Sequence, residues 1–202
     1  MRRLPDCPNI DGNDIPGEKQ TAVLEAQLFF GWSDGLENMD RIDKAETIWY
    51  SEGGRRCRMM ASVFDTAKYI LEKRGELSTM KLQKLCYYAQ AWSLVWDDAP
   101  LFEADFEAWA NGPVCAELYN YSRGKFSVSP KEMTGSSANL TANQKESIDK
   151  VLDYYGDKNA QWLSQLTHME DPWQEARNNL PSESRSGAII TKESMAMYYG
   201  GL

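Results

Sequence analysis

His168 is the only histidine of the 202-residue chain, and it lies in the segment LTHMEDPWQEAR. A histidine close to Glu170 and Asp171 can act as a general base, bind a metal ion or join two helix ends. Catalysis needs a second group within hydrogen-bond reach, and the chain contains no GxSxG motif, no HExxH motif and no cysteine placed as a nucleophile. We therefore expect a structural role for His168. An enzyme that pairs it with Glu170, Asp171 or Arg177 is the alternative.

Two further sets of side chains could bind metal ions, but their spacing argues against it. The carboxylates of the first set straddle a loop and an alternating segment, where most such groups are simply solvated. The 4 cysteines of the second set form no CxxC pair, and one histidine cannot complete a zinc site of the usual spacing. We expect reduced thiols, no metal and no cofactor. The carboxylates are Asp97, Asp98, Glu103, Asp105 and Glu107, and the thiols are Cys7, Cys57, Cys86 and Cys115.

The charge and hydropathy of the chain narrow the class of partner. The formal net charge is -8, and the 22 basic residues are dispersed singly or in short pairs, which disfavours nucleic-acid binding. A DNA-binding repressor would also need a basic face or an added helix-turn-helix. No apolar run is long enough to cross a bilayer, and none follows Arg2-Arg3 as in a secretory signal. We expect a cytoplasmic protein that contacts no membrane and binds a basic protein.

The elements that position His168 are predicted to be mainly helices. Ser62 can cap a helix with Asp65 at its third position, and a second helix, capped near Ser78, runs through TMKLQKLCYYAQAWSLVW. The apolar stripe of this second helix is wide, which predicts burial on more than one side. The segment PLFEADFEAW then alternates apolar and polar residues, as a short strand does. The fold class is mainly α: a compact helical domain with a short β or extended segment around residues 101–110.

The second half of the chain continues this helical pattern. In NGPVCAELYNY, we expect Pro113 at the first position of a helix, where its missing amide hydrogen costs nothing. Residues 124–139 are polar and typical of a loop, and Thr141 with Gln144 forms a capping box for the next helix. A short helix should end near His168, where exposed carbonyls favour a positive imidazole. Asp171 should cap the following helix, and a last helix closes the chain.

The N-terminal part differs from the rest. It contains turn signals and one weak helical stretch, EKQTAVLEAQLFF, and no run that seals a core. Arg55-Arg56 can be encoded by AGGAGG, a ribosome-binding sequence placed suitably before a start at Met59. We predict a domain over residues 60–202 and an extension over residues 1–59 that is disordered or upstream of the true start. An extension that selects the partner is the alternative, and an intact mass near 23.0 kDa from the native locus would support it.

Five segments together carry a family resemblance: KLQKLCYYAQAW, PLFEADFEAWANGPVCAELY, the capping box with its helix, LTHMEDPWQEAR and the closing helix. In this order, over about residues 62–199, the chain resembles the Panacea domain family, which includes SocA-like antitoxins and related phage-associated proteins. The resemblance implies a mostly helical domain found in antitoxins that neutralise very different toxins by binding them. In the SocA-like branch it also implies an adaptor that presents its toxin to a cytoplasmic ATP-dependent protease.

The resemblance assigns a set of motif residues to this chain. We expect most of them to determine the fold, because family members that bind different toxins should share scaffold residues and differ in contact residues. Packing also favours core positions for Leu, Trp and Tyr. Ala110 and Asn111 depart from the family pattern, in which an aromatic residue often precedes the Gly-Pro pair, so the surface of this loop should differ. The motif residues are Lys81, Leu82, Lys84, Leu85, Tyr88, Gln90, Trp92, Ala108, Trp109, Gly112, Pro113, Val114, Tyr119, Thr167, His168, Pro172, Trp173 and Arg177.

The function implied is stoichiometric protein binding without chemistry. We expect an antitoxin that binds a cognate protein toxin encoded by an adjacent gene, with the protease adaptor and the enzyme using His168 as alternatives. Loops on a rigid scaffold can vary without unfolding it. We therefore expect the contact surface near the NGPV loop and residues 124–139, with Glu117 and Lys125 as candidate contact residues.

Overall fold

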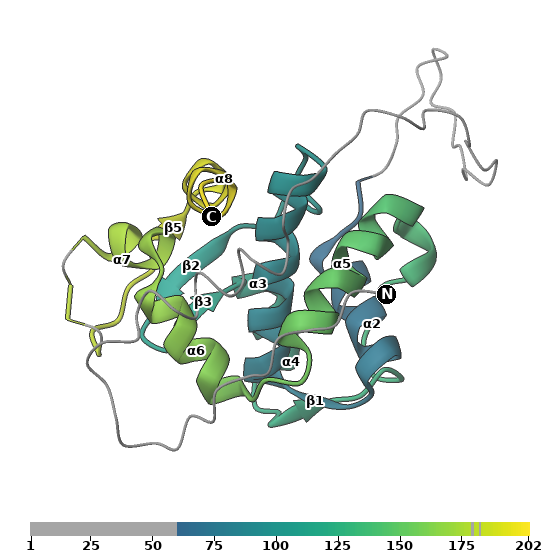
Figure 1. Ribbon diagram of the computed structural model, residues 1–202. Coiled ribbons are helices and arrows are strands. Elements are labelled where there is room, and N and C mark those ends of the chain that lie inside the picture. Colours follow the sequence, from purple (N-terminus) through teal and green to yellow (C-terminus); the bar gives the residue numbers. More distant parts are fainter. Residues whose placement is uncertain (1–59, 179, 182) are drawn as a thin grey trace, which may run out of the picture. The chain divides into compact units, whose positions relative to one another are not determined.

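The computed structural model describes residues 60–178, 180–181 and 183–202, and the expectations for residues 1–59 lie outside this part. Helices dominate this part and the strands are short, so the predicted fold class is confirmed (Figure 1). In chain order the elements are α2 (Val63–Arg74), β1 (Leu77–Ser78), α3 (Thr79–Trp96), β2 (Phe106–Trp109), β3 (Gly112–Val114), α4 (Ala116–Ser122), β4 (Ser127–Val128), the 3-10 helix η1 (Ser137–Asn139), α5 (Ala142–Tyr155), α6 (Ala160–Met169), α7 (Asp171–Arg177), β5 (Ile189–Ile190) and α8 (Lys192–Gly200).

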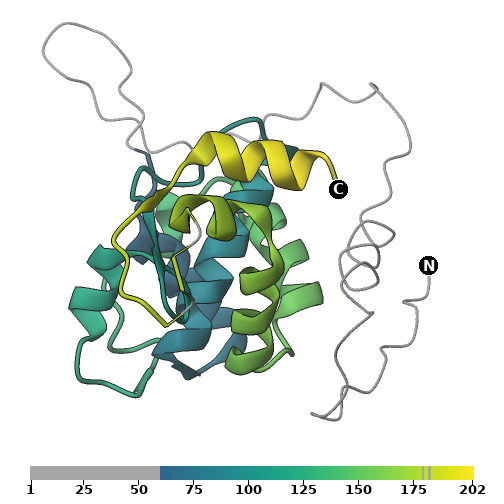
Figure 2. The same cartoon turned by 90° about the vertical axis from the view of Figure 1, so that its left-hand side faces the viewer.

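Helix α3 is the centre of the domain. It packs against α2, α4, α5, α6, α8 and β3, and every residue from Leu82 to Ser93 is buried. The wide apolar stripe seen in the sequence therefore reflects a helix enclosed on several sides. The last helix, α8, runs across α3 rather than along it (Figure 2). Within residues 60–178, 180–181 and 183–202, no helix has the length and apolar character needed to span a bilayer.

The ends of the long helices follow local capping signals. Ser62 and Asp65 form a complete capping box at α2, and Thr141 and Gln144 form another at α5. The hydroxyl of Ser78 accepts a hydrogen bond from the backbone N–H of Lys81 at the start of α3. These three predicted starts are confirmed. Each depends on residues within one helical turn, which a sequence pattern records directly.

Strands β2 and β3 form a hairpin that corrects the prediction for Pro113. The hairpin pairs Trp109 with Gly112, and the three-stranded sheet has the order β3-β2-β5. Pro113 lies in β3, and α4 begins only at Ala116, so the expected helix start at Pro113 is wrong. Gly112 adopts φ +92, a left-handed conformation suited to glycine, and so turns the chain back along β2. Pairing with β2 thus holds Pro113 in an extended conformation.

The segment over residues 124–139, expected to be a polar loop, contains β4 and η1 and is fastened to α2. Strand β4 pairs with β1, and Lys68 Nζ donates a hydrogen bond to the carbonyl of Pro130 at 2.6 Å. The Asp65 carboxylate accepts hydrogen bonds from the Ser136 backbone N–H at 2.7 Å and from Asn139. Backbone and side-chain contacts therefore hold this segment against the helical core.

Candidate functional site

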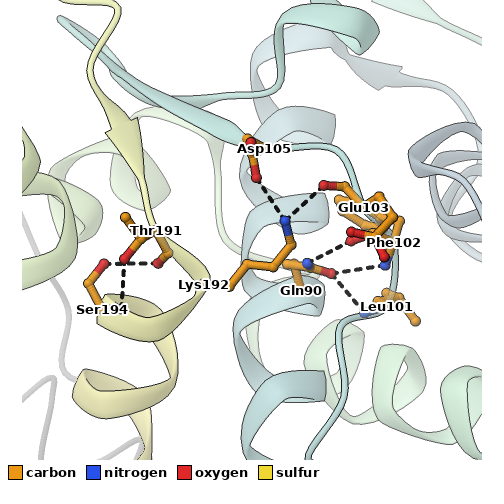
Figure 3. Close-up of polar contacts among 8 residues, drawn as sticks. All are labelled: Gln90, Leu101, Phe102, Glu103, Asp105, Thr191, Lys192 and Ser194. Carbon is orange, nitrogen blue, oxygen red and sulfur yellow. Dashed lines mark hydrogen bonds and ion pairs between the residues drawn. The ribbon is translucent and has the colours of Figure 1, made fainter.

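Gln90 on α3 binds the backbone of the segment that leads into β2. Its Nε2 donates to the carbonyl of Phe102 at 2.9 Å, and its Oε1 accepts from the N–H groups of Leu101 and Phe102 at 2.9 and 3.2 Å (Figure 3). The side chain is buried, with 1% of its surface exposed. Because buried backbone groups need partners, Gln90 replaces the hydrogen bonds that this non-helical segment cannot make itself.

Lys84, Gly112, Pro113 and Thr167 meet where the hairpin packs against α3 and α6. Lys84 Nζ donates to the carbonyl of Pro113 at 2.9 Å, and burial of the ammonium lowers its pKa to about 7. A Cβ atom on Gly112 would lie 2.6 Å from Thr167 Oγ1 and 2.8 Å from Lys84 Nζ. Glycine is therefore required at position 112 by both the backbone angle and the space available.

Glu170 is buried among tyrosines from three helices. Its carboxyl accepts hydrogen bonds from Tyr199 Oη at 2.7 Å and from Tyr88 Oη at 3.2 Å. The Tyr88 ring stacks on Tyr155 at 4.1 Å, so this cluster joins α3, α5 and α8 to the start of α7. Burial raises the pKa of Glu170 to about 8, which favours the neutral acid at pH 7.

This position of Glu170 was not predicted. Helix α7 begins at Asp171, and the N-cap residue of this helix is Glu170. The Glu170 side chain makes no capping hydrogen bond, because it turns into the core. Asp171 was expected as the cap, and that expectation is wrong. No local pattern could have revealed the contact, because Tyr88 lies 82 positions earlier in the chain.

His168 lies in the last turn of α6, as predicted, with its ring stacked on Trp173 at a centroid distance of 4.2 Å. Burial lowers the pKa of the imidazole, as do the positive charges of Lys84 and Arg177, although a hydrogen bond to the backbone of Ala110 opposes this change. The expectation that the helix end favours a positive imidazole is therefore wrong, because desolvation outweighs the dipole. In the part of the chain described, His168 Nε2 has no hydrogen-bond partner.

Arg177 has 1% of its surface exposed and donates hydrogen bonds to backbone carbonyls. Its Nη1 donates to Ala108 at 2.8 Å, and its Nη2 donates to Pro181 at 2.6 Å and to Ser184 at 2.8 Å. The guanidinium also lies 4.8 Å from the ring centroid of Trp173. Arg177 thus joins α7 to β2 and to the segment that precedes β5.

Of the side chains in the enzyme hypothesis, His168 and Arg177 both lie against the ring of Trp173, whereas Glu170 bonds to tyrosines. Glu170 bonds to Tyr88 and Tyr199, and Arg177 bonds to backbone carbonyls. The motif residue Pro172 is the second residue of α7 and is buried. The arrangement can fix helices α6 and α7 against the hairpin.

The acidic side chains considered as metal ligands are also separated. Asp97 accepts a hydrogen bond from Ser147 at 2.9 Å, and Asp105 forms an ion pair with Lys192 at 2.7 Å (Figure 3). Glu107 instead accepts a hydrogen bond from the Trp109 indole. Across the residues that the structure describes, no group of three or more His, Cys, Asp or Glu side chains could hold a metal ion.

The motif residues differ in burial, and only a few reach the surface. Tyr119 is 39% exposed, while Lys81, Trp109 and His168 are partly buried. Of the two candidate contact residues, Glu117 is exposed in the first turn of α4, and Lys125 is paired with Glu132 at 3.1 Å. The buried members of the motif are Leu82, Lys84, Leu85, Tyr88, Gln90, Trp92, Ala108, Gly112, Pro113, Val114, Thr167, Pro172, Trp173 and Arg177.

Comparison with known proteins confirms the family resemblance over part of the chain. Residues 82–174 match the family described as Antitoxin SocA-like, Panacea domain. This range begins near the start of α3, includes the β2–β3 hairpin and ends within α7. No curated protein and no solved structure gives a significant match to the chain.

Proposed function

We propose that this chain, whose residues 82–174 match the SocA-like antitoxin family, is an antitoxin that neutralises a cognate protein toxin by binding it directly. The family match is the observation that carries the proposal. A protein toxin encoded by an adjacent gene is the partner, and the complex forms in the cytoplasm.

The internal contacts of the motif residues support a binding role without chemistry. Gln90, Lys84 and Arg177 use their polar groups on backbone carbonyls and N–H groups of their own chain. Such residues fix the scaffold and leave recognition to side chains at the surface. Surface side chains can differ between family members without disturbing the hydrogen bonds that hold the fold.

A growth assay tests the proposal directly. The adjacent gene, expressed alone, should arrest growth, and co-expression of residues 60–202 should restore it. Co-purification of the two proteins should then recover a stoichiometric complex. The absence of any toxic neighbour, or rescue with no detectable complex, would contradict direct binding. Rescue that disappears in cells without their ATP-dependent protease would favour the adaptor alternative.

Charge reversals test the expected location of the contact surface. Glu117→Lys and Lys125→Glu should both leave the protein folded, because exposed ion pairs such as Lys125–Glu132 contribute about 1 kcal/mol or less. At least one of them should weaken neutralisation. Lys125→Gln is the matched control for loss of the ion pair alone. If both reversed variants neutralise the toxin as the parent does, the NGPV loop and residues 124–139 are not the contact surface.

A further inference from the structure

One face of the sheet β3-β2-β5 is partly open along β2 and β5, whereas Val114 of β3, which pairs with Glu107, is buried. Side chains alternate along β2, so Phe106 and Ala108 point into the core, where 1% and 0% of their surfaces are exposed. Glu107 and Trp109 point to the opposite face, and both are partly exposed. Trp109 is one of the motif residues, but the contact surface expected from the sequence lies in loops rather than on this face.

Neighbouring elements extend this face with apolar side chains. The register places Ile189 of β5 directly opposite Glu107, and 45% of Ile189 is exposed. The ring of Tyr119 on α4 packs edge-on against Trp109 with a centroid distance of 4.8 Å, and 39% of Tyr119 is exposed. We call Glu107, Trp109, Tyr119 and Ile189 the outer sheet face.

The polar groups of the outer sheet face indicate the charge of a protein surface that could bind there. The Trp109 indole N–H donates to Glu107 Oε2 at 2.7 Å, so the indole needs no further partner. Within the described residues, this is the only hydrogen bond of the Glu107 carboxylate, and no basic side chain forms an ion pair with it. Covering a carboxylate without a new partner would cost free energy, and a Lys or Arg side chain on the covering surface would offset that cost.

We propose that the outer sheet face, together with the loop surface that the charge reversals test, binds the toxin, through a segment that places a Lys or Arg side chain on Glu107 and apolar side chains on Ile189, Trp109 and Tyr119. This inference rests on the proposed function. Aromatic side chains that are partly exposed and held by neighbours are typical anchors of protein interfaces. A basic partner also suits a chain with a formal net charge of -8.

Charge disfavours a second copy of this chain as the occupant. A symmetric dimer would bring the outer sheet face against itself and place both copies of Glu107 in one interface without a cation from this face. Like charges at an interface oppose association. The outer sheet face therefore fits a different, basic protein better than a second copy.

Binding measurements with the full chain and the purified toxin test the inference. Glu107→Lys and Ile189→Asp should each weaken binding about tenfold or more, and Glu107→Gln should weaken it less while reducing its dependence on salt concentration. Met197→Asp is the matched control, because Met197 is 79% exposed on α8, outside the outer sheet face, and should leave affinity unchanged. Circular dichroism and tryptophan fluorescence verify that each variant is folded.

The outcomes separate this inference from the antitoxin function. If the parent chain binds the toxin and folded Glu107→Lys and Ile189→Asp bind it equally well, the outer sheet face is not the site, and the antitoxin function stands. Equal weakening by Met197→Asp would also overturn the inference. If the parent chain binds no toxin, the proposed function itself fails. A parent chain that forms a dimer, with Ile189→Asp abolishing the dimer, would identify a second copy as the occupant.

Discussion

Replacement of Glu170 by glutamine should change how stability depends on pH. In the unfolded chain this carboxyl has its ordinary pKa of 4.5, whereas burial raises the pKa of Glu170 to about 8 in the folded protein. Between these values the folded protein binds a proton that the unfolded chain does not. The stability that the neutral acid provides is therefore fully present below pH 4.5, falls as pH rises, and is lost once the pH exceeds about 8.

The size of the effect follows from the pH range between the two pKa values of Glu170, 4.5 in the unfolded chain and about 8 in the folded protein. A difference of one pH unit within it changes the free energy of unfolding by about 1.4 kcal/mol. Between pH 5 and pH 8 the parent protein should therefore lose about 4 kcal/mol through this one group. Glu170→Gln is neutral at every pH, and its amide can accept from one tyrosine hydroxyl and donate to the other. The variant should match the parent at pH 5 and exceed it in stability at pH 8.

Urea unfolding followed by tryptophan fluorescence at pH 5, 6, 7 and 8 measures the difference between the two proteins. Taking the difference removes contributions that both share, including that of Lys84, whose lowered pKa of about 7 gives an opposite slope above that pH. The free-energy difference should grow steadily toward pH 8. A difference that stays constant with pH would refute the reasoning, because it would mean that Glu170 is ionised in the folded protein.

Three further substitutions test contacts that hold the domain. Gln90→Ala should lower the free energy of unfolding by about 2–4 kcal/mol in urea titrations, because three buried backbone groups lose their partner; no loss would mean that water replaces the amide. Gly112→Ala should reduce the thermal midpoint sharply, since its Cβ would lie 2.6 Å from Thr167 Oγ1 at a backbone φ of +92, whereas an unchanged midpoint would show that the hairpin can shift. His168→Ala should cost about 1–2 kcal/mol through loss of the stack on Trp173 and a backbone hydrogen bond, with His168→Asn milder. The folded His168→Ala protein should still neutralise toxin, and its failure to do so would move His168 into the functional site.

Local sequence patterns accounted for where the long helices begin. The capping box of Ser62 with Asp65 and the cap at Ser78 use contacts between residues three positions apart. The breadth of the apolar stripe on α3 likewise indicated that it is enclosed. These features could be predicted because the interacting atoms are brought together by the helix itself.

The outer sheet face was less predictable, because its geometry depends on residues that are distant in the sequence. Glu107 was expected to be solvated, yet it accepts a hydrogen bond from Trp109 and lies opposite Ile189 of β5. No local pattern marks Ile189 in the sequence, because one exposed isoleucine near the end of the chain forms no periodic stripe. Only the strand register brings these side chains onto one face.

Local patterns along the chain were enough to predict the helical fold class, the family resemblance and the helix starts that caps define. Contacts between distant segments instead make Pro113 extended in a hairpin, turn Glu170 inward to Tyr88 and Tyr199, and lower the pKa of His168. Caps and periodicity arise from neighbours along the chain, whereas strand pairing and desolvation arise from segments that meet only when the core forms. The burial and pKa of a side chain therefore cannot be predicted from its neighbours along the chain alone.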